Sequence, residues 1–388
     1  MKKGSDKRME MSRRGFLKAA ALTGAAICVS PALERVEAAE RAISKTSAKD
    51  IPAGMAAVRK RRTLGSGQAA FTVSAMSFGC MDLNYHRSKH PDEAACIRLV
   101  HEAIERGVTL FDTAESYGPF TNEVLMGKAL KGYTNRVCVT SKFGHKYVND
   151  VQVKTEEYSS PANIRKVCEN SLRSLGVEKL DMFYQHRGDP NTPIEVVAET
   201  IAELIKEGKI LHWGLCEVNA DTIRRAHVIC PITAIQSEYH LMHRTVEESV
   251  LPLCRELGIG FVPYSPINRG FLGGLINEHT KFSPNDNRQT LPRFQPEAIR
   301  QNLRIVEVLN QFGRTRGYTP AQIDTLGGKE NPPAASDGIL ARQNGADSLL
   351  VNCLPEVTHG VQRQKAGCKL TQNAKIQVVS VKYASGVE

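Results

Sequence analysis

The sequence predicts an α/β protein, with an eight-stranded barrel of alternating strands and helices as the favoured architecture. Short runs rich in Val, Ile and Phe alternate with amphipathic helical stretches, and the repeat spacing is about twenty to forty-five residues. A chain of 388 residues is long enough for one such barrel with insertions. A doubly wound open sheet is the runner-up, although no G-x-G-x-x-G motif follows the first strand.

Seven strands are expected, and polar residues follow most of them. The strands are residues 75–79, 108–112, 137–142, 180–186, 210–215, 232–236 and 259–264. At or just past their carboxyl ends stand Asp112, Lys142, His186, Glu217, Gln236 and Ser265. In a barrel these ends converge on one face, where active sites lie, whereas an open sheet would spread them along an edge.

Start and stop signals delimit four of the connecting helices. Ser, Thr or Asp precedes the first turn, and glycine follows the last one. The expected helices are residues 92–107, 160–176, 192–208 and 245–258. The segments 192–195 (TPIE) and 245–248 (TVEE) predict capping boxes, and Pro252 is expected to kink the last helix.

The first 38 residues are expected to be an export signal, followed by a linker over residues 39–61. The segment 12–18 (SRRGFLK) places two arginines before an apolar stretch, and small residues at 36–38 suit cleavage. This is the pattern of twin-arginine export, so we expect a periplasmic or other extracytoplasmic location, with the twin-arginine translocase as a transient partner. An amphipathic N-terminal helix is the alternative.

Composition argues against several other classes of protein. The net charge is +10, but residues 1–38 carry +4 of it and the remaining basic residues are interspersed with acidic ones, so no nucleic-acid partner is expected. No run of 18 apolar residues predicts a membrane span. The ten cysteines form no CxxC pair, and no metal site is predicted.

Four of the polar residues suit acid catalysis of carbonyl reduction. A free tyrosine such as Tyr117 has a pKa of about 10, and a neighbouring Lys142 ammonium lowers it by stabilising the phenolate. Asp112 holds the lysine charged, and His186 donates a hydrogen bond to the substrate carbonyl. Together they would protonate an oxygen as a hydride reaches the adjoining carbon.

Six motifs resemble those of the aldo-keto reductase superfamily, in its bacterial branch related to potassium-channel β-subunits. They are GVTLFDTAESYGPFTNEVLMGKAL, VTSKFG, LDMFYQHR, GLCEVNA, IQSEYHLMHR and GIGFVPYSPINRGFLGG. The resemblance covers about residues 62–323. It implies a (β/α)8 TIM barrel with NADPH across its mouth, and it assigns the family's tetrad to Asp112, Tyr117, Lys142 and His186.

The resemblance also implies the residues that hold the cofactor. Tyr264 matches the aromatic that stacks on the nicotinamide, and Gln236, Cys216 and Glu217 match the positions that hold its carboxamide. The loop around the pyrophosphate matches Ser265, Ile267, Arg269 and Gly270. Cys216 replaces a usual serine and Asn268 a usual glycine. Trp213, Arg187 and Tyr239 are candidates for the substrate pocket, with plain packing as the equal alternative.

The pattern stops after Ile323. Residues 324–388 are rich in Gly, Pro and Asn and show no helical period, which we interpret as an out-of-frame tail, with a divergent functional tail as the alternative. Residues 348–352 could supply the eighth strand. The expected function is reduction of small aldehydes or ketones by NADPH. The alternatives are an NADPH-binding regulatory subunit with little turnover and an inactive product of a damaged gene.

Overall fold

A computed structural model describes residues 61–85, 90–148, 151–153, 158–284, 286–314 and 320. The predicted export signal, nearly all of the predicted linker and the divergent tail lie outside these residues. So does the segment 348–352, which could supply an eighth strand.

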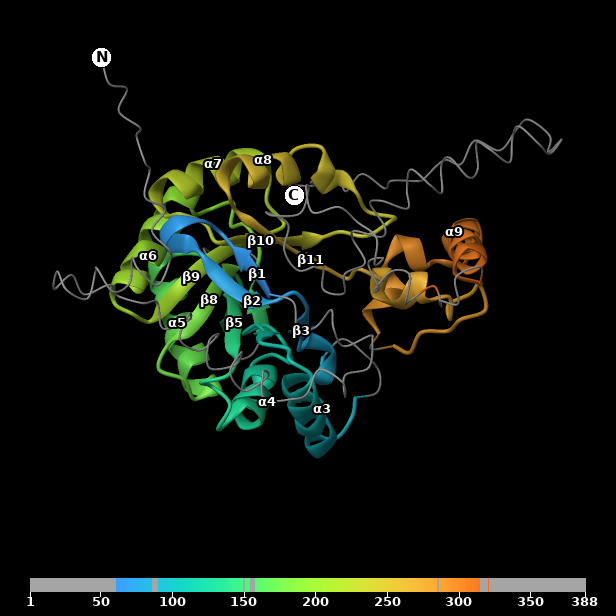
Figure 1. Cartoon of the computed structure of the whole chain (residues 1–388), viewed down its shortest axis with the longest axis horizontal. Coiled ribbons are helices and arrows are strands. Elements are labelled where there is room, and N and C mark those ends of the chain that lie inside the picture. The colour runs from blue at the N-terminus through green and yellow to red at the C-terminus, as the bar shows by residue number, and fades with distance from the viewer. Residues whose placement is uncertain are drawn as a thin grey trace, which may run out of the picture.

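A parallel sheet of seven strands curls around the centre of the molecule (Figure 1). Its strands are β3 (Ser77–Gly79), β4 (Leu110–Asp112), β5 (Cys138–Phe143), β8 (Leu180–Gln185), β9 (Ile210–Cys216), β10 (Ala234–Glu238) and β11 (Gly260–Tyr264). Their order is β11-β10-β9-β8-β5-β4-β3, and every pairing is parallel. The predicted α/β barrel architecture is confirmed. Within the described residues, its sheet is open between β3 and β11.

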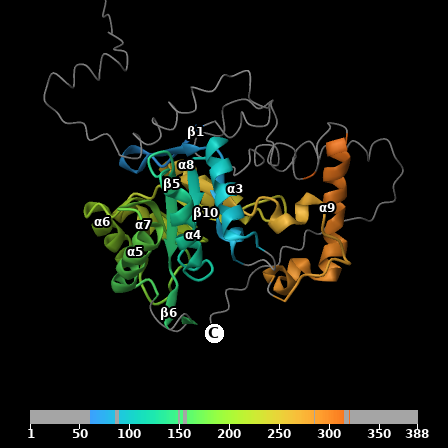
Figure 2. The ribbon, with the colours of Figure 1, turned by 90° about the horizontal axis from the view of Figure 1, so that it is seen from below.

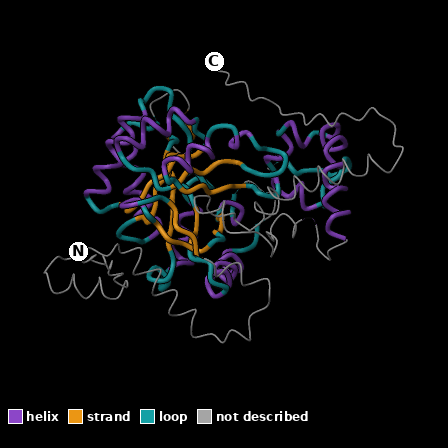
Figure 3. The backbone as a smooth tube through the Cα atoms, turned by 45° about the horizontal axis from the view of Figure 1, so that its top comes forward, coloured by secondary structure: helices purple, strands orange, loops and turns teal. Residues whose placement is uncertain are grey.

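Helices cover the outer face of this sheet, as Figure 3 shows. They are α3 (Glu93–Glu105), α4 (Thr121–Leu130), α5 (Pro161–Leu175), α6 (Ile194–Lys206), α7 (Ala220–Ile229) and α8 (Val250–Leu257). The four helices expected from the sequence are among them. Asp92 caps α3 by accepting from Ala95 N, and Gly176 and Gly258 end α5 and α8 in the left-handed conformation.

Both predicted capping boxes are wrong. The Thr192 hydroxyl donates to Asp189 rather than capping α6, which has no side-chain cap. The second box falls in a 3-10 helix, Thr245–Glu247, that has no side-chain cap, and the Thr245 hydroxyl lies 3.3 Å from His243 Nε2. Because α8 begins only after that turn, Pro252 lies in its first turn, where no helical partner awaits its missing N–H. The expected kink therefore has no cause.

Alternation along the strands separates two cores. Side chains such as Phe111, Val139 and Phe183 point outward and pack with the helices. Their neighbours Leu110 and Cys138 point inward, together with other residues of the barrel interior: Met182, Tyr184, Cys216, Ala234 and Val262. This period of two is what a sheet buried on both faces requires.

A hairpin closes the amino-terminal end of the barrel. Strands β1 (Arg61–Leu64) and β2 (Phe71–Ser74) pair antiparallel and lie across the sheet in Figure 1. Their side chains Leu64, Phe71 and Val73 join the inward core. Leu64 packs directly on Gly260 of β11, where a Cβ atom would lie 3.0 Å from the Leu64 Cα. The close approach of hairpin and barrel thus depends on a residue without a side chain.

Beyond β11, a second small core packs against α9 (Pro296–Arg314), which stands apart from the barrel helices in Figure 2. Its buried members are Phe271, Leu272, Ile276, Phe294, Ile299, Val306 and Leu309. An ion pair of 2.6 Å between Arg293 and Glu238 ties this segment to β10. In the described part of the chain, no helix combines the length and apolarity needed to cross a membrane.

Two buried carboxyls lie behind the sheet, on its helix side. Glu123 of α4 accepts a hydrogen bond of 2.5 Å from the Ser141 hydroxyl of β5. Glu115 is 5% exposed, and its Oε2 has no hydrogen-bond partner. Burial and the nearby Glu123 raise the pKa of Glu115 to about 8, against a smaller opposing effect of Lys166. The folded protein therefore favours the protonated form of Glu115.

We predict that Gly260→Ala destabilises the protein by about 1–3 kcal/mol, because the added Cβ overpacks against Leu64. Thermal melting measures the loss. Gly188→Ala is the control, since a Cβ there meets nothing within 4 Å. Equal melting of the two variants would contradict the hairpin contact.

We predict that Glu115→Gln gains stability over the wild type as the pH rises from 5 to 9. Because its pKa is raised in the folded protein, the wild-type carboxyl stabilises the fold fully below its ordinary pKa of 4.5 and loses this contribution as the pH passes about 8. The difference should change by about 4 kcal/mol between pH 5 and pH 9, read from urea melts across the pH range. Glu199→Gln, on the exposed side of α6, should follow the wild type. Parallel curves for wild type and Glu115→Gln would refute the assignment.

Candidate active site

Along the strands, the side chains that point into the barrel change from apolar to polar at the carboxyl end. Two residues beyond Leu110 comes Asp112, and beyond Cys138 come Thr140 and then Lys142. The same period leads from Tyr184 to His186, from Ala234 to Gln236 and from Val262 to Tyr264. The barrel's apolar interior therefore gives way to a polar mouth at the carboxyl ends of the strands.

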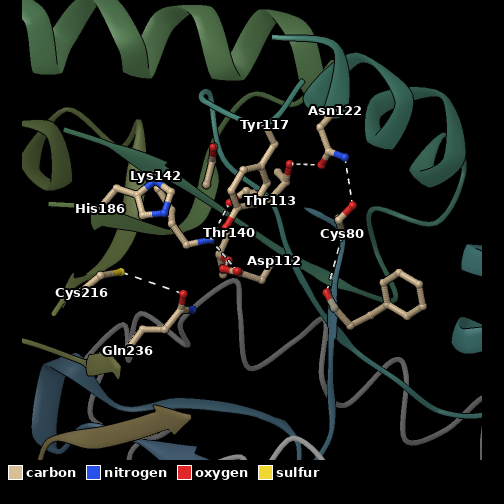
Figure 4. A network of polar contacts seen from close by, with 12 residues as sticks. Cys80, Asp112, Thr113, Tyr117, Asn122, Thr140, Lys142, His186, Cys216 and Gln236 are labelled. Atoms are coloured by element: carbon tan, nitrogen blue, oxygen red, sulfur yellow. Dashed lines mark hydrogen bonds and ion pairs between the residues drawn. The ribbon is translucent and has the colours of Figure 1, made fainter. Parts of the chain in front are cut away.

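A buried ion pair lies at the centre of this mouth (Figure 4). The Lys142 ammonium donates to Asp112 Oδ2 at 2.5 Å and to the Thr113 carbonyl at 2.8 Å. The second oxygen of Asp112 accepts from the Thr140 hydroxyl at 2.6 Å. Lys142 is 1% exposed and Asp112 is 9% exposed. Every charge in the pair is thus matched by a charge or a hydrogen bond.

Lys142 remains an ammonium in this setting. Burial works to lower the pKa of Lys142, but the Asp112 carboxylate and the hydrogen bond to it outweigh that effect and raise the pKa above its usual value. A fixed positive charge therefore lies within the barrel mouth at neutral pH.

Tyr117 stands over this charge. Its hydroxyl lies 3.4 Å from the Lys142 ammonium, which is 5.0 Å from the centre of the Tyr117 ring. Burial raises the pKa of Tyr117 to about 12, and Lys142 only partly offsets this. The sequence-based expectation of a lowered pKa is therefore wrong for this structure, because desolvation of the phenolate outweighs the lysine charge. At neutral pH the Tyr117 side chain is therefore a neutral phenol, which can donate its proton.

His186 contacts Tyr117 edge to face, with ring centres 5.7 Å apart. Burial, with the charges of Lys142 and Arg187, holds the pKa of His186 well below its usual value, so the imidazole is neutral. The Ser116 hydroxyl lies 3.3 Å from Nδ1. A hydroxyl that donates to Nδ1 leaves the ring proton on Nε2. That tautomer makes His186 a neutral hydrogen-bond donor.

A cavity of about 700 Å³ opens over these residues. Of the residues predicted for the site, it is lined by Asp112, Tyr117, His186, Cys216, Gln236, Tyr264, Ser265, Ile267, Arg269 and Gly270. Lys142 lies beneath it, within contact of Tyr117. Glu217 is absent from the lining: its carboxylate accepts from the Glu238 amide at 2.7 Å and so braces β9 against β10.

Of the three candidates for the substrate pocket, only Arg187 lines the cavity. Trp213 is completely buried in the outer core, and its indole N–H donates to the carbonyls of Cys230 and Pro231. The Tyr239 hydroxyl donates to Glu247. For Trp213 and Tyr239 the packing alternative is therefore correct.

The loops after β9 and β11 carry unusual backbone conformations. Among the described residues, four of the five non-glycine residues with positive φ are here: Glu217, Ser265, Asn268 and Arg269. Such conformations cost free energy and gather at functional sites. They also explain the substitution noted at Asn268, because asparagine tolerates the left-handed region better than other side chains with a Cβ.

These loops suit a nicotinamide dinucleotide. Tyr264 offers a ring to the cavity beside Cys216 and Gln236, whose side chains approach each other to 4.0 Å. The buried Nε of Arg269 and Oδ1 of Asn268 have no hydrogen-bond partner. A buried guanidinium N–H with no acceptor is suited to an anionic group. The Tyr264 ring, the Gln236 amide and the unpaired Arg269 N–H are thus suited to the nicotinamide ring, its carboxamide and the pyrophosphate of such a cofactor.

Sequence reasoning missed the residues on the other side of the cavity. They are Met81, Tyr85, Ser116, His145, Tyr147 and Gln152. His145, Tyr147 and Gln152 belong to an insertion after β5 that contains the short strands β6 (Lys146–Val148) and β7 (Val151–Val153). The cluster of His and Tyr directly after the motif VTSKFG was the available signal.

Comparison with known proteins places this geometry in a family. The aldo/keto reductase family model matches residues 75–325. The glycerol dehydrogenase AKR11B4 from Gluconobacter oxydans is 25% identical, with a TM-score of 0.64 over 80% of this chain and 98% of that chain. The aldo-keto reductase AKR11C1 from Bacillus halodurans, in its holo form, is 26% identical, with a TM-score of 0.57 over 81% and 93%.

The fold also matches the thermostable aldo-keto reductase Tm1743, with a TM-score of 0.54 over 81% of this chain and 96% of that chain at 20% identity. The family match extends from just before β3 to beyond α9, more than half of the 388 residues. The chain therefore belongs to the aldo/keto reductase family of oxidoreductases, which generally use nicotinamide cofactors.

Proposed function

We propose that this chain is an NADPH-dependent reductase of small aldehydes and ketones, with Tyr117 as the proton donor. One observation carries the proposal: a protonated phenol faces an open cavity while its hydroxyl lies 3.4 Å from a buried ammonium. NADPH, when bound, supplies a hydride to the carbonyl carbon. The remaining chemistry is proton transfer and charge stabilisation, which the chain's own residues provide.

Tyr117 and His186 hold the carbonyl oxygen. The Tyr117 hydroxyl and the His186 Nε2–H both donate, so an oxygen between them is oriented and polarised. As negative charge develops on that oxygen, Tyr117 transfers its proton to it. The resulting phenolate is stabilised by the Lys142 ammonium, which is already in place and needs no reorganisation. Asp112 keeps that ammonium charged throughout.

The cofactor would lie on the side of the cavity formed by β9, β10 and β11. Tyr264, Gln236 and Cys216 would hold the nicotinamide, and Ser265, Ile267, Arg269 and Gly270 would hold the pyrophosphate. Their place around one cavity supports these roles. NADPH rather than NADH rests on the family resemblance alone.

We also propose export by the twin-arginine route, supported by the segment 12–18 (SRRGFLK) before its apolar stretch. The prediction is that replacing both Arg13 and Arg14 by Lys retains the full-length chain in the cytoplasm of a host with this translocase. Cell fractionation with immunoblotting measures it, with Lys7→Arg as the control. Unchanged export of the double variant would overturn the proposal.

We predict that Tyr117→Phe lowers kcat for carbonyl reduction by about 100-fold or more, because the proton donor is lost. The NADPH dissociation constant should stay within about threefold, since the ring remains. Steady-state kinetics and a fluorescence titration measure the two. Tyr133→Phe, which alters a tyrosine packed against His101 on the outer face, is the matched control.

Two outcomes would decide against this function. Retained turnover in Tyr117→Phe would remove Tyr117 from its role. A wild-type chain that binds NADPH but reduces no carbonyl compound would instead be the cofactor-binding subunit considered from the sequence.

A further inference from the structure

The loop between β4 and α4 carries three of the groups that the proposed reaction uses. The Thr113 carbonyl accepts from the ammonium of the buried ion pair at 2.8 Å. The Ser116 hydroxyl lies 3.3 Å from His186 Nδ1, and Tyr117 supplies the phenol. Glu115 precedes Ser116 in this loop and makes none of these contacts. A movement of Glu115 would nevertheless reach the groups that hold the carbonyl oxygen, because the same short loop carries them.

Hydrogen bonds brace the backbone of Glu115 on both sides. Its amide donates to the Lys142 carbonyl at 3.4 Å, which ties the loop to β5. Its carbonyl accepts from the Phe120 amide at 2.9 Å. Phe120 has a φ of 69°, a costly conformation for a bulky residue that surrounding contacts must stabilise. The braced loop therefore has little freedom to absorb a displaced Glu115 without moving Ser116 and Tyr117.

The Glu115 carboxyl is buried behind the sheet, and its Oε2 has no hydrogen-bond partner. The titratable side chains that act on it come from three elements: Glu123 of α4, Lys166 of α5 and Tyr147 of β6. Glu123 is itself fixed, because its Oε1 accepts from the Ser141 hydroxyl at 2.5 Å. The pKa of Tyr147 is raised to about 12, so this phenol is uncharged at neutral pH.

The neutral and the ionised forms of Glu115 favour different positions. The neutral carboxyl can remain close to Glu123, and a pKa of about 8 makes this the form present at neutral pH. The ionised carboxylate is repelled by Glu123 and attracted by the ammonium of Lys166, which is exposed on α5. Loss of the proton therefore draws Glu115 away from α4 and toward α5.

The groups around the carbonyl oxygen keep their charge over the same pH range. The pKa of Tyr117 is about 12, and that of His186 lies well below its usual value. The Asp112 carboxylate raises the pKa of Lys142 above its usual value. A loss of activity near pH 8 would therefore report the ionisation of Glu115 rather than that of the proton donor.

We propose that Glu115 is a positioning residue: its neutral carboxyl keeps Ser116 and Tyr117 in place for the reaction, and its loss of a proton displaces them and slows reduction. This inference rests on the proposed reductase function and names a regulation of the same site. The enzyme would be active in neutral or weakly acidic surroundings and would lose activity in alkaline ones.

The test follows the single-turnover rate of 4-nitrobenzaldehyde reduction by NADPH from pH 6 to pH 10. We expect the wild-type rate to fall about tenfold, with its midpoint near pH 8. Glu115→Gln cannot ionise, so its rate should match the wild type at pH 6 and stay within about twofold up to pH 10. A flat wild-type profile, or the same fall in Glu115→Gln, would overturn the proposal.

Two further variants distinguish the position of this charge from a general effect of alkaline pH. Lys166→Gln removes the attraction for the ionised form, so the midpoint of the fall should move to higher pH. Glu199→Gln, on the exposed side of α6, should keep the wild-type midpoint. An unchanged midpoint in Lys166→Gln would count against the movement toward α5.

An NMR measurement without substrate separates this inference from the proposed function. Selective ¹⁵N labelling of serine and tyrosine makes the Ser116 and Tyr117 amides observable. Their signals should shift with a midpoint near pH 8 in the wild-type chain and stay constant in Glu115→Gln. Such shifts would support the positioning role even if no carbonyl compound were reduced. Turnover without such shifts would refute the positioning role and leave the reductase function standing.

Discussion

The ion pair between Lys142 and Asp112 is the interaction on which the site depends. An ammonium with 1% exposure survives only because a carboxylate and a backbone carbonyl meet it within the barrel. Breaking such a pair by removing one partner costs about 3–5 kcal/mol, since the other charge stays buried. The pair joins β4 to β5, whose register aligns Asp112 with Thr140. The register of β4 and β5 therefore fixes the position of the buried ion pair, and the ion pair in turn fixes the charge beside the Tyr117 hydroxyl.

Much of the fold and the centre of the site follow from the sequence alone. Strand and helix periods differ clearly along this chain, and a polar residue at the end of an apolar strand points to the mouth of a barrel. This is why Asp112, Lys142 and His186 could be brought together before any coordinates. Tyr117 joined them because it follows Asp112 by five residues. The family resemblance then added the cofactor loops.

Other features depend on tertiary context that no local pattern carries. The two threonine boxes satisfy the capping rule, yet the Thr192 hydroxyl bonds to neighbouring Asp189 and the Thr245 hydroxyl lies beside His243 instead. The pKa of Tyr117 depends on how much protein surrounds the phenol, which the order of residues does not state. Tyr85 stands in a loop and Tyr147 in the three-residue strand β6, both too short to show a sequence period, so only the folded chain shows that they face the same cavity.

The central claim is that the buried Lys142 charge enables Tyr117 to act as an acid. Its most direct test is single-turnover reduction of 4-nitrobenzaldehyde by NADPH in the double variant Lys142→Met/Asp112→Asn, which leaves no buried charge unpaired. Our account predicts that the reduction step slows by about 100-fold or more while NADPH binding and cooperative melting persist. A reduction step at the wild-type rate would contradict it.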